Sequence, residues 1–212
     1  MAATRLVVFD FDGTLADTNK CIVSSWQHTL RRMGLPEVSA ERIQAPIGLP
    51  LKDSFRIAVP EERLDEAVDI YHEAFHAVAR DSVTAFDGVR EALEAISSLG
   101  IDMAVASSRG NDSLEDLVDA LDMTKYFRLI CGGEFAEHPK PAPDLVLHIL
   151  SELGVSASDT LVVGDAVFDI GMGNSAGCRT CGVTWGNQSR EQLMTSSPDM
   201  VIDRVEELVP LL

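Results

Sequence analysis

Two aspartates separated by one residue follow a short apolar run near the start of the chain. Residues 6–9 read Leu-Val-Val-Phe, and Asp10-Phe11-Asp12-Gly13 comes directly after them. An apolar run of this length predicts a strand that is buried on both faces. The side-chain period of two would point both carboxylates the same way at the end of that strand. Paired acids there are costly unless a cation or a proton lies between them, so the pattern favours a site over the ordinary start of a loop.

A second pair of acids, Asp165 and Asp169, follows another predicted strand. A spacing of four places both on one face of a helix, where acids near the N-terminus are also favourable without any site. If they reach the sheet edge that carries Asp10 and Asp12, four carboxylates meet there. Hard oxygen ligands in this number select Mg²⁺.

A lysine and two serines complete the candidate set. Lys140 lies within HPKPAP (138–143), where the flanking prolines restrict the backbone and hold the lysine on a stiff segment. A plain turn before a helix is the alternative. Ser107 and Ser108 follow the strand predicted at 101–106, where hydroxyls and free N–H groups could hold phosphate oxygens. Serines are also ordinary loop residues, so this signal is weak by itself.

With these four motifs in order, DFDGT, Ser107, KPAP and GDAVFD, the chain resembles the haloacid dehalogenase-like hydrolases. The resemblance implies that Asp10 is a nucleophile that forms an aspartyl-phosphate, and that Asp12 is the general acid and base. It also implies that Ser107 holds the phosphoryl group, supported by Ser108, and that Lys140 neutralises the nucleophile and that group.

The same resemblance implies a Mg²⁺ site. Its protein ligands would be the Asp10 side chain, the Asp12 backbone carbonyl and Asp165. Asp169 would lie nearby and act through water or through Lys140.

The elements that must position these residues follow from periodicity. Residues 17–79 show only helical patterns, whereas strands and helices alternate from residue 87 onward. This predicts an α/β fold, a doubly wound parallel sheet with an inserted α-helical cap domain. The expected boundaries are residues 1–16 and 84–212 for the core and 17–83 for the cap. In an open parallel sheet the site lies beyond the carboxyl ends of the strands.

Within the predicted cap, Lys52 follows the break Pro46-Ile47-Gly48. One interpretation is a solvated lysine on a helix. The other is that Lys52 meets a second anionic group of the substrate, because the rest of the chain is so acidic.

Composition excludes some partners. The formal net charge is −17, with 34 acidic against 17 basic residues. Nucleic acid and anionic membranes both require basic surface, so neither is expected. No apolar run approaches the ~20 residues of a membrane helix, and Met1 to Leu6 lack the apolar segment of a signal peptide. The expected location is the cytosol.

Two further patterns are interpreted as structural. The glycines between Gly171 and Gly177 lie inside a predicted helix rather than at its opening turn, which favours close packing over a dinucleotide site. Cys178 and Cys181 form C-x-x-C, but they precede a strand rather than open a helix, which opposes a redox role.

The resulting hypothesis is a Mg²⁺-dependent phosphatase acting on a small, phosphoglycolate-like phosphorylated metabolite, because the helical cap and GVTWG (182–186) resemble the phosphoglycolate phosphatase-like branch. The start of the cap also resembles bacterial pyrophosphatases, so an inorganic pyrophosphatase is an alternative. A sugar phosphomutase is another, although that group carries a histidine where Ile22 stands here. Asp12 opposes a dehalogenase, and the complete motif set opposes a non-catalytic binding protein.

Overall fold

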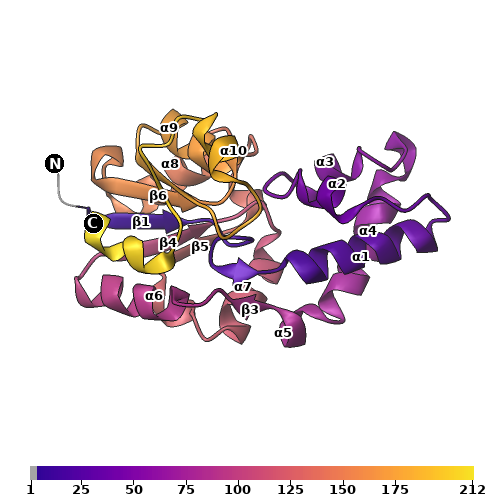
Figure 1. Ribbon diagram of the computed structural model, residues 1–212, viewed down its shortest axis with the longest axis horizontal. Helices are drawn as coiled ribbons and strands as arrows, with labels where there is room; N and C mark the ends of the chain where they lie inside the picture. The colour runs from indigo at the N-terminus through magenta and orange to yellow at the C-terminus, as the bar shows by residue number, and fades with distance from the viewer. Residues whose placement is uncertain (1–3) are drawn as a thin grey trace.

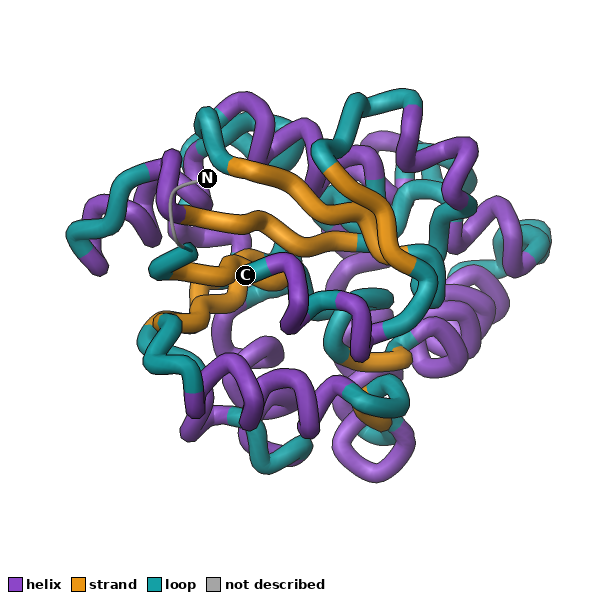
Figure 2. Tube along the Cα trace, turned by 60° about the vertical axis from the view of Figure 1, so that its left-hand side comes forward, coloured by secondary structure: helices purple, strands orange, loops and turns teal. Residues whose placement is uncertain are grey.

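Six parallel strands form one twisted sheet at the centre of the computed structural model, which describes residues 4–212 (Figures 1 and 2). Residues 1–3 lie outside the described residues. They belong to the predicted core and to the segment, Met1 to Leu6, that was compared with a signal peptide. The sheet order is β5-β4-β1-β6-β7-β8. The strands are β1 (Leu6–Phe9), β4 (Asp102–Ala106), β5 (Leu129–Cys131), β6 (Thr160–Gly164), β7 (Arg179–Val183) and β8 (Met200–Ile202). The predicted α/β fold class is confirmed.

Helices cover both faces of this sheet (Figure 1). One face carries α6 (Val89–Ser98) and α7 (Asn111–Ala120), and the other carries α8 (Asp144–Leu153) and α9 (Val167–Ser175). The short α10 (Arg190–Met194) packs beside α9 and β7. Single turns of 3₁₀-helix occur at Glu61–Arg63, Thr124–Tyr126, Gly133–Phe135, Ala157–Asp159, Val205–Glu207 and Val209–Leu211.

Strand β1 is buried because its two neighbours and both helical layers enclose it. Val7 and Phe9 belong to the core under α6 and α7, whereas Leu6 and Val8 belong to the core under α8 and α9. All four side chains are at most 3% exposed. Alternate residues of a strand point to opposite faces, so a strand with a core on each side has no polar position. The first polar residue, Asp10, therefore falls at the edge of the sheet.

The chain leaves the sheet after β1 and forms a separate group of helices, residues 19–82, here called the helical block. It comprises α1 (Asn19–Arg32), α2 (Ala40–Gln44), α3 (Leu51–Phe55), α4 (Leu64–His76) and α5 (Ala79–Ser82). A two-stranded antiparallel ribbon, β2 (Ala16–Asp17) with β3 (Thr84–Ala85), connects it to the rest. The block lies beyond the carboxyl ends of the parallel strands (Figure 1).

Aromatic side chains fill the interior of the helical block. The ring of Phe55 lies 4.1 Å from that of Trp26 and 5.9 Å from that of Tyr71, measured between centroids. Tyr71 in turn stacks on Phe75 at 5.6 Å. This cluster joins α1, α3 and α4, and its members belong to the same hydrophobic core as Val7 and Phe9 of β1. Within residues 4–212, no helix has both the length and the apolar character needed to cross a membrane.

Candidate active site

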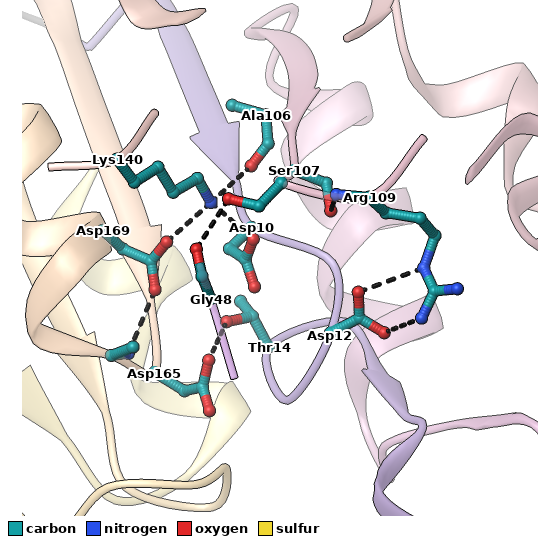
Figure 3. Close-up of polar contacts among 12 residues, drawn as sticks. Asp10, Asp12, Thr14, Gly48, Ala106, Ser107, Arg109, Lys140, Asp165 and Asp169 are labelled. Atoms are coloured by element: carbon teal, nitrogen blue, oxygen red, sulfur yellow. Dashed lines mark hydrogen bonds and ion pairs between the residues drawn. The ribbon is translucent and has the colours of Figure 1, made fainter. Parts of the chain in front are cut away.

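The carboxylate of Asp10 lies at the carboxyl end of β1 and is paired with a buried lysine. The Lys140 ammonium is 2.6 Å from Asp10 Oδ1 and 2.7 Å from Asp169 Oδ1, and it also donates to the Ala106 carbonyl at 2.8 Å (Figure 3). The Lys140 side chain is fully buried. Burial lowers the pKa of this ammonium, but the two carboxylates outweigh that effect and raise it, so Lys140 remains charged.

Close packing holds the lysine segment in place. A Cβ added at Gly171, inside α9, would lie only 2.7 Å from Cβ of Pro141. A Cβ at Gly173 would lie 2.9 Å from Cβ of Val162 in the sheet. The interpretation as close-packing residues is therefore confirmed for Gly171 and Gly173, but it is wrong for Gly177, which lies after the end of α9 with a φ of +76° and only Ala157 Cβ, at 4.0 Å, beside the position of an added Cβ. Gly171 and Gly173 allow α9 to approach the proline-flanked segment that carries Lys140.

Asp165 lies beside the first loop of the chain rather than on a helix. Helix α9 begins only at Val167, so the prediction that Asp165 and Asp169 share a helix face is wrong for Asp165. Its Oδ2 accepts hydrogen bonds from the backbone N of Asn187 at 2.6 Å and from the Asn187 amide at 2.8 Å, while its Oδ1 accepts from Thr14 at 3.3 Å. The two acids nevertheless lie close together, with carboxylate oxygens within 4.8 Å of each other.

Gly13 allows this approach of the first loop to Asp165. Its φ is +86°, and any added Cβ would overlap the Asp165 carboxylate. Only glycine adopts this conformation without strain and leaves that space open. The indole of Trp185 also donates to the Thr14 carbonyl at 3.0 Å, which ties the same loop to the segment after β7.

Three of these carboxylates fit a metal ion. Oxygens of Asp10, Asp165 and Asp169 lie within 4.8 Å of one another, and all three residues are buried. Burial raises the pKa of Asp10 well above its usual range, against the effect of Lys140. Burial and the neighbouring Asp169 raise the pKa of Asp165 to about 7. One ammonium does not balance three buried acids, whereas a divalent cation would.

A buried amide oxygen next to the cluster supports that fit. Among the described residues, Oδ1 of Asn187 is buried without a hydrogen-bond partner, while the Nδ2 of the same amide donates to Asp165. Buried polar atoms rarely stay unpaired, and water around a bound cation is a common partner.

Asp12 faces away from Lys140 and forms an ion pair with Arg109 (Figure 3). The guanidinium donates from Nη2 to Oδ1 at 2.6 Å and from Nε to Oδ2 at 3.1 Å. The carbon at the centre of this guanidinium lies 4.4 Å from the centroid of the Phe75 ring, which belongs to the helical block. Arg109 therefore connects the predicted acid and base to that block.

The two predicted serines lie on the sheet side of the same region. Ser107 is 1% exposed, and its Oγ accepts from the backbone N of Arg109 at 3.2 Å. Ser108 instead donates to the carbonyl of Gly48 at 2.6 Å, so it contacts the helical block directly. Asp10, Asp12, both serines and Lys140 all line one cavity.

Asp165 and Asp169 belong to the acidic cluster with Asp10 but do not line the cavity, whereas Lys52 belongs to neither the cluster nor the cavity lining. Its ammonium lies 2.6 Å from Oδ1 of Asp65, and both side chains are solvent-exposed. The position matches the solvated-lysine interpretation rather than the substrate-binding one.

Sequence reasoning did not identify Arg109, Thr14 or Asn187 as site residues. Arg109 stands directly after the two serines, so its position at a strand end was the available signal. Thr14 is the threonine of DFDGT, but nothing local indicated that it would contact Asp165. The contact of Asn187 depends on a loop from a distant strand and has no local signal.

Comparisons with known proteins identify the family of the chain. The family model described as haloacid dehalogenase-like hydrolase matches residues 7–183. The chain is 38% identical to "Probable phosphatase IndB" of Dickeya dadantii, with 96% of this chain and 91% of that protein covered. It is 30% identical to pyrophosphatase PpaX of Anoxybacillus flavithermus, with 97% and 95% covered. A haloacid dehalogenase-like family hydrolase from Streptococcus pneumoniae has the same fold, with a TM-score of 0.91, 24% identity and 98% of each chain covered.

The fold and the site define an enzyme of the α/β class with its acids at the carboxyl edge of a parallel sheet. The chain belongs to the haloacid dehalogenase-like hydrolases, as its motifs predicted.

Proposed function

We propose that the chain is a Mg²⁺-dependent phosphatase that hydrolyses a small phosphorylated metabolite. The observation that carries this proposal is the buried Asp10 carboxylate, held 2.6 Å from Lys140 and beside Asp165 and Asp169. A carboxylate with a fixed cation next to it can attack phosphorus, and the phosphoryl oxygens then meet positive charge. The curated relatives named as a phosphatase and as a pyrophosphatase support the same class of reaction.

In the first step, an Asp10 oxygen forms a bond to phosphorus and the bond from phosphorus to the ester oxygen breaks. Asp12 gives its proton to that leaving oxygen. Ser107 and Lys140 hold the phosphoryl oxygens, since both line the cavity next to Asp10. In the second step, Asp12 takes a proton from a water molecule that attacks phosphorus, and the aspartyl-phosphate gives free phosphate and Asp10.

The Asp10 and Asp165 carboxylates, with the backbone carbonyl of Asp12, are the proposed protein ligands of Mg²⁺, and Asp169 stands behind them through Lys140. When bound, the ion neutralises charge on the phosphoryl group and on the carboxylates around it. Asp169 also accepts from the backbone N of Ala166 at 3.0 Å, which fixes its orientation toward Lys140.

We also propose that residues 17–83 act as a cap domain and that residues up to 16 and from 84 form the core. The ribbon of β2 and β3 places entry to and exit from the helical block side by side. Such a connection lets the block move as a unit over the cavity and exclude water during the reaction.

Two alternatives share this site. An inorganic pyrophosphatase is favoured by the names of several relatives. A sugar phosphomutase is disfavoured, because Ile22, which stands where that group has histidine, gives the cavity an apolar side chain that cannot transfer a proton.

The test is phosphate release from 4-nitrophenyl phosphate by the full chain with Mg²⁺ and with excess EDTA. Hydrolysis should require Mg²⁺ and disappear in Asp10→Asn. The turnover rate of Asp12→Asn should be lower than that of the wild type by a factor of about 10²–10⁴, because general acid and base catalysis is lost. Full activity of Asp10→Asn would overturn the mechanism.

A further inference from the structure

The cavity between the sheet edge and the helical block has two unlike walls. Its volume is about 440 Å³, which leaves room beyond a phosphoryl group. The core side is polar and includes the acids and cations already described. The block side is mainly apolar, with Trp26, Ile43, Ile47, Leu49, Leu51 and Tyr71 among the lining residues. Of the described residues that the block contributes to this lining, none is a lysine, arginine, aspartate or glutamate.

The one titratable imidazole on the apolar side does not supply a cation. His72 lines the cavity, and its pKa is lowered by burial and by the neighbouring His76 and Arg109. The neutral ring is therefore its form at pH 7.

Both cations of the core wall already have carboxylate partners. Lys140 pairs with Asp10 and Asp169, and Arg109 binds both oxygens of Asp12. A third acid in the lining, the exposed Glu134, adds negative charge to the core wall. A second anionic group on a substrate would therefore have to compete with a carboxylate for each lysine or arginine among the described lining residues, and it would lose its hydration against apolar side chains.

The apolar wall is held over the site by contacts between the block and the core. Ser108 donates to the Gly48 carbonyl at 2.6 Å. A Cβ at Gly48, whose φ is +104°, would lie 3.2 Å from the Phe168 ring, so this turn rests against the core. In this arrangement its neighbours Ile47 and Leu49 form part of the cavity wall.

We propose that this enzyme prefers phosphate monoesters whose leaving group is apolar and uncharged, and that it discriminates against leaving groups with a second anion, including pyrophosphate and phosphoglycolate. The inference rests on the proposed phosphatase function. It differs from the expectation of a phosphoglycolate-like substrate and opposes the pyrophosphatase alternative, because Lys52, the lysine expected to bind a second anion, does not line the cavity.

The test compares 4-carboxyphenyl phosphate with its methyl ester, which share one ring and differ in the charge of the distal group. For the wild-type chain with Mg²⁺, kcat/KM should be at least about tenfold higher for the methyl ester, and pyrophosphate should be a poorer substrate still. Equal or faster hydrolysis of the carboxylate, or of pyrophosphate, would overturn the inference and leave the phosphatase function intact. Hydrolysis of none of the three would overturn the phosphatase function and the inference with it.

The two substrates can also differ in the acidity of their leaving groups. A charge placed in the cavity wall separates the effect of the cavity from this effect. Leu49→Lys should shift the ratio of the two kcat/KM values toward the carboxylate by about tenfold, and Ile47→Lys, a second variant, should do the same. The matched control is Ile57→Lys, at an isoleucine of the same block that is 38% exposed and outside the cavity. It should keep the wild-type ratio. An unchanged ratio in folded Leu49→Lys and Ile47→Lys would contradict the proposal.

Discussion

Both carboxylate oxygens of Asp12 accept hydrogen bonds from the guanidinium of Arg109, at 2.6 and 3.1 Å. The side chains are 13% and 10% exposed, so the pair is largely withdrawn from water. The predicted acid and base is therefore held by a cation that also stacks on Phe75 of the helical block. In the proposed mechanism Asp12 exchanges this partner for a proton before it protonates the leaving group, which would couple its chemistry to the position of the block.

Removal of Arg109 should destabilise the protein by leaving a carboxylate in a poorly hydrated site. We expect Arg109→Met to lower the free energy of unfolding by about 3 kcal/mol, measured by urea denaturation. The double variant Arg109→Met/Asp12→Asn should recover part of that loss, because the unpaired charge is gone. If the effects of the two substitutions on the free energy of unfolding are additive, the ion pair contributes no interaction energy of its own.

Lys140 should be required for binding of phosphoryl analogues at Asp10. Beryllium fluoride with Mg²⁺ should raise the Tm of the wild-type chain, because it mimics a phosphoryl group on the Asp10 carboxylate. In Lys140→Ala the shift should be much smaller, since the ammonium 2.6 Å from Asp10 is lost. An undiminished shift in a folded Lys140→Ala protein would limit the lysine to a structural role.

Metal binding should stabilise the folded chain through Asp165. Saturation at about 100 times the Kd corresponds to ~2.7 kcal/mol, so Mg²⁺ should raise the Tm clearly and EDTA should reverse the effect. Asp165→Asn should abolish this shift. The control is Asp69→Asn, an exposed acid on α4, which should respond to Mg²⁺ like the wild type. A full Mg²⁺ shift in Asp165→Asn would place the metal elsewhere.

Lys52→Ala should leave the KM for a good substrate within about twofold of the wild-type value, because an exposed ion pair with Asp65 contributes little to binding. Steady-state kinetics at saturating Mg²⁺ decides this. A KM that rises for anionic substrates while aryl phosphates are unaffected would mean that Lys52 swings into the cavity when the block closes.

The cysteines should be unreactive in the folded protein at neutral pH. Burial raises the pKa of the Cys131 and Cys181 thiols to about 12 and that of Cys178 to about 11. At pH 8, alkylation by iodoacetamide should be slower than in urea by about 10² or more, because both thiolate and access are lacking. Rapid labelling of the C-x-x-C pair without denaturant would restore the redox interpretation.

The same shifts predict alkaline destabilisation. These thiols lose their protons near pH 9 in the unfolded chain but only near pH 11–12 when folded, so the unfolded state binds fewer protons between these values. Their stabilising contribution is complete below pH 9 and is lost as pH rises toward 12. In urea denaturation, Cys131→Ala or Cys181→Ala should show a smaller drop between pH 9 and 10.5 than the wild type shows.

The sequence by itself determined the elements and the residue types at the strand ends. The apolar run 6–9 requires a doubly buried strand, so Asp10 had to fall at a sheet edge, and the same logic placed Ser107 and Asp165 there. The prolines around Lys140 and the helical periodicities of 17–79 are equally local. Each of these signals depends on neighbours within a few positions, which is the range over which backbone preferences and amphipathic patterns act.

Only the tertiary structure decided which groups face one another across the site. Asp12 could have faced Asp10, but it pairs with Arg109, 97 positions along the chain. Asp165 could have extended the face of α9, but it meets Thr14 and Asn187. The apolar wall and the exclusion of Lys52 from it likewise depend on where the helical block rests. The partner of each carboxylate depends on the cost of removing it from water and on the gain from pairing with a group elsewhere in the chain. Both quantities are set only when distant segments are packed together.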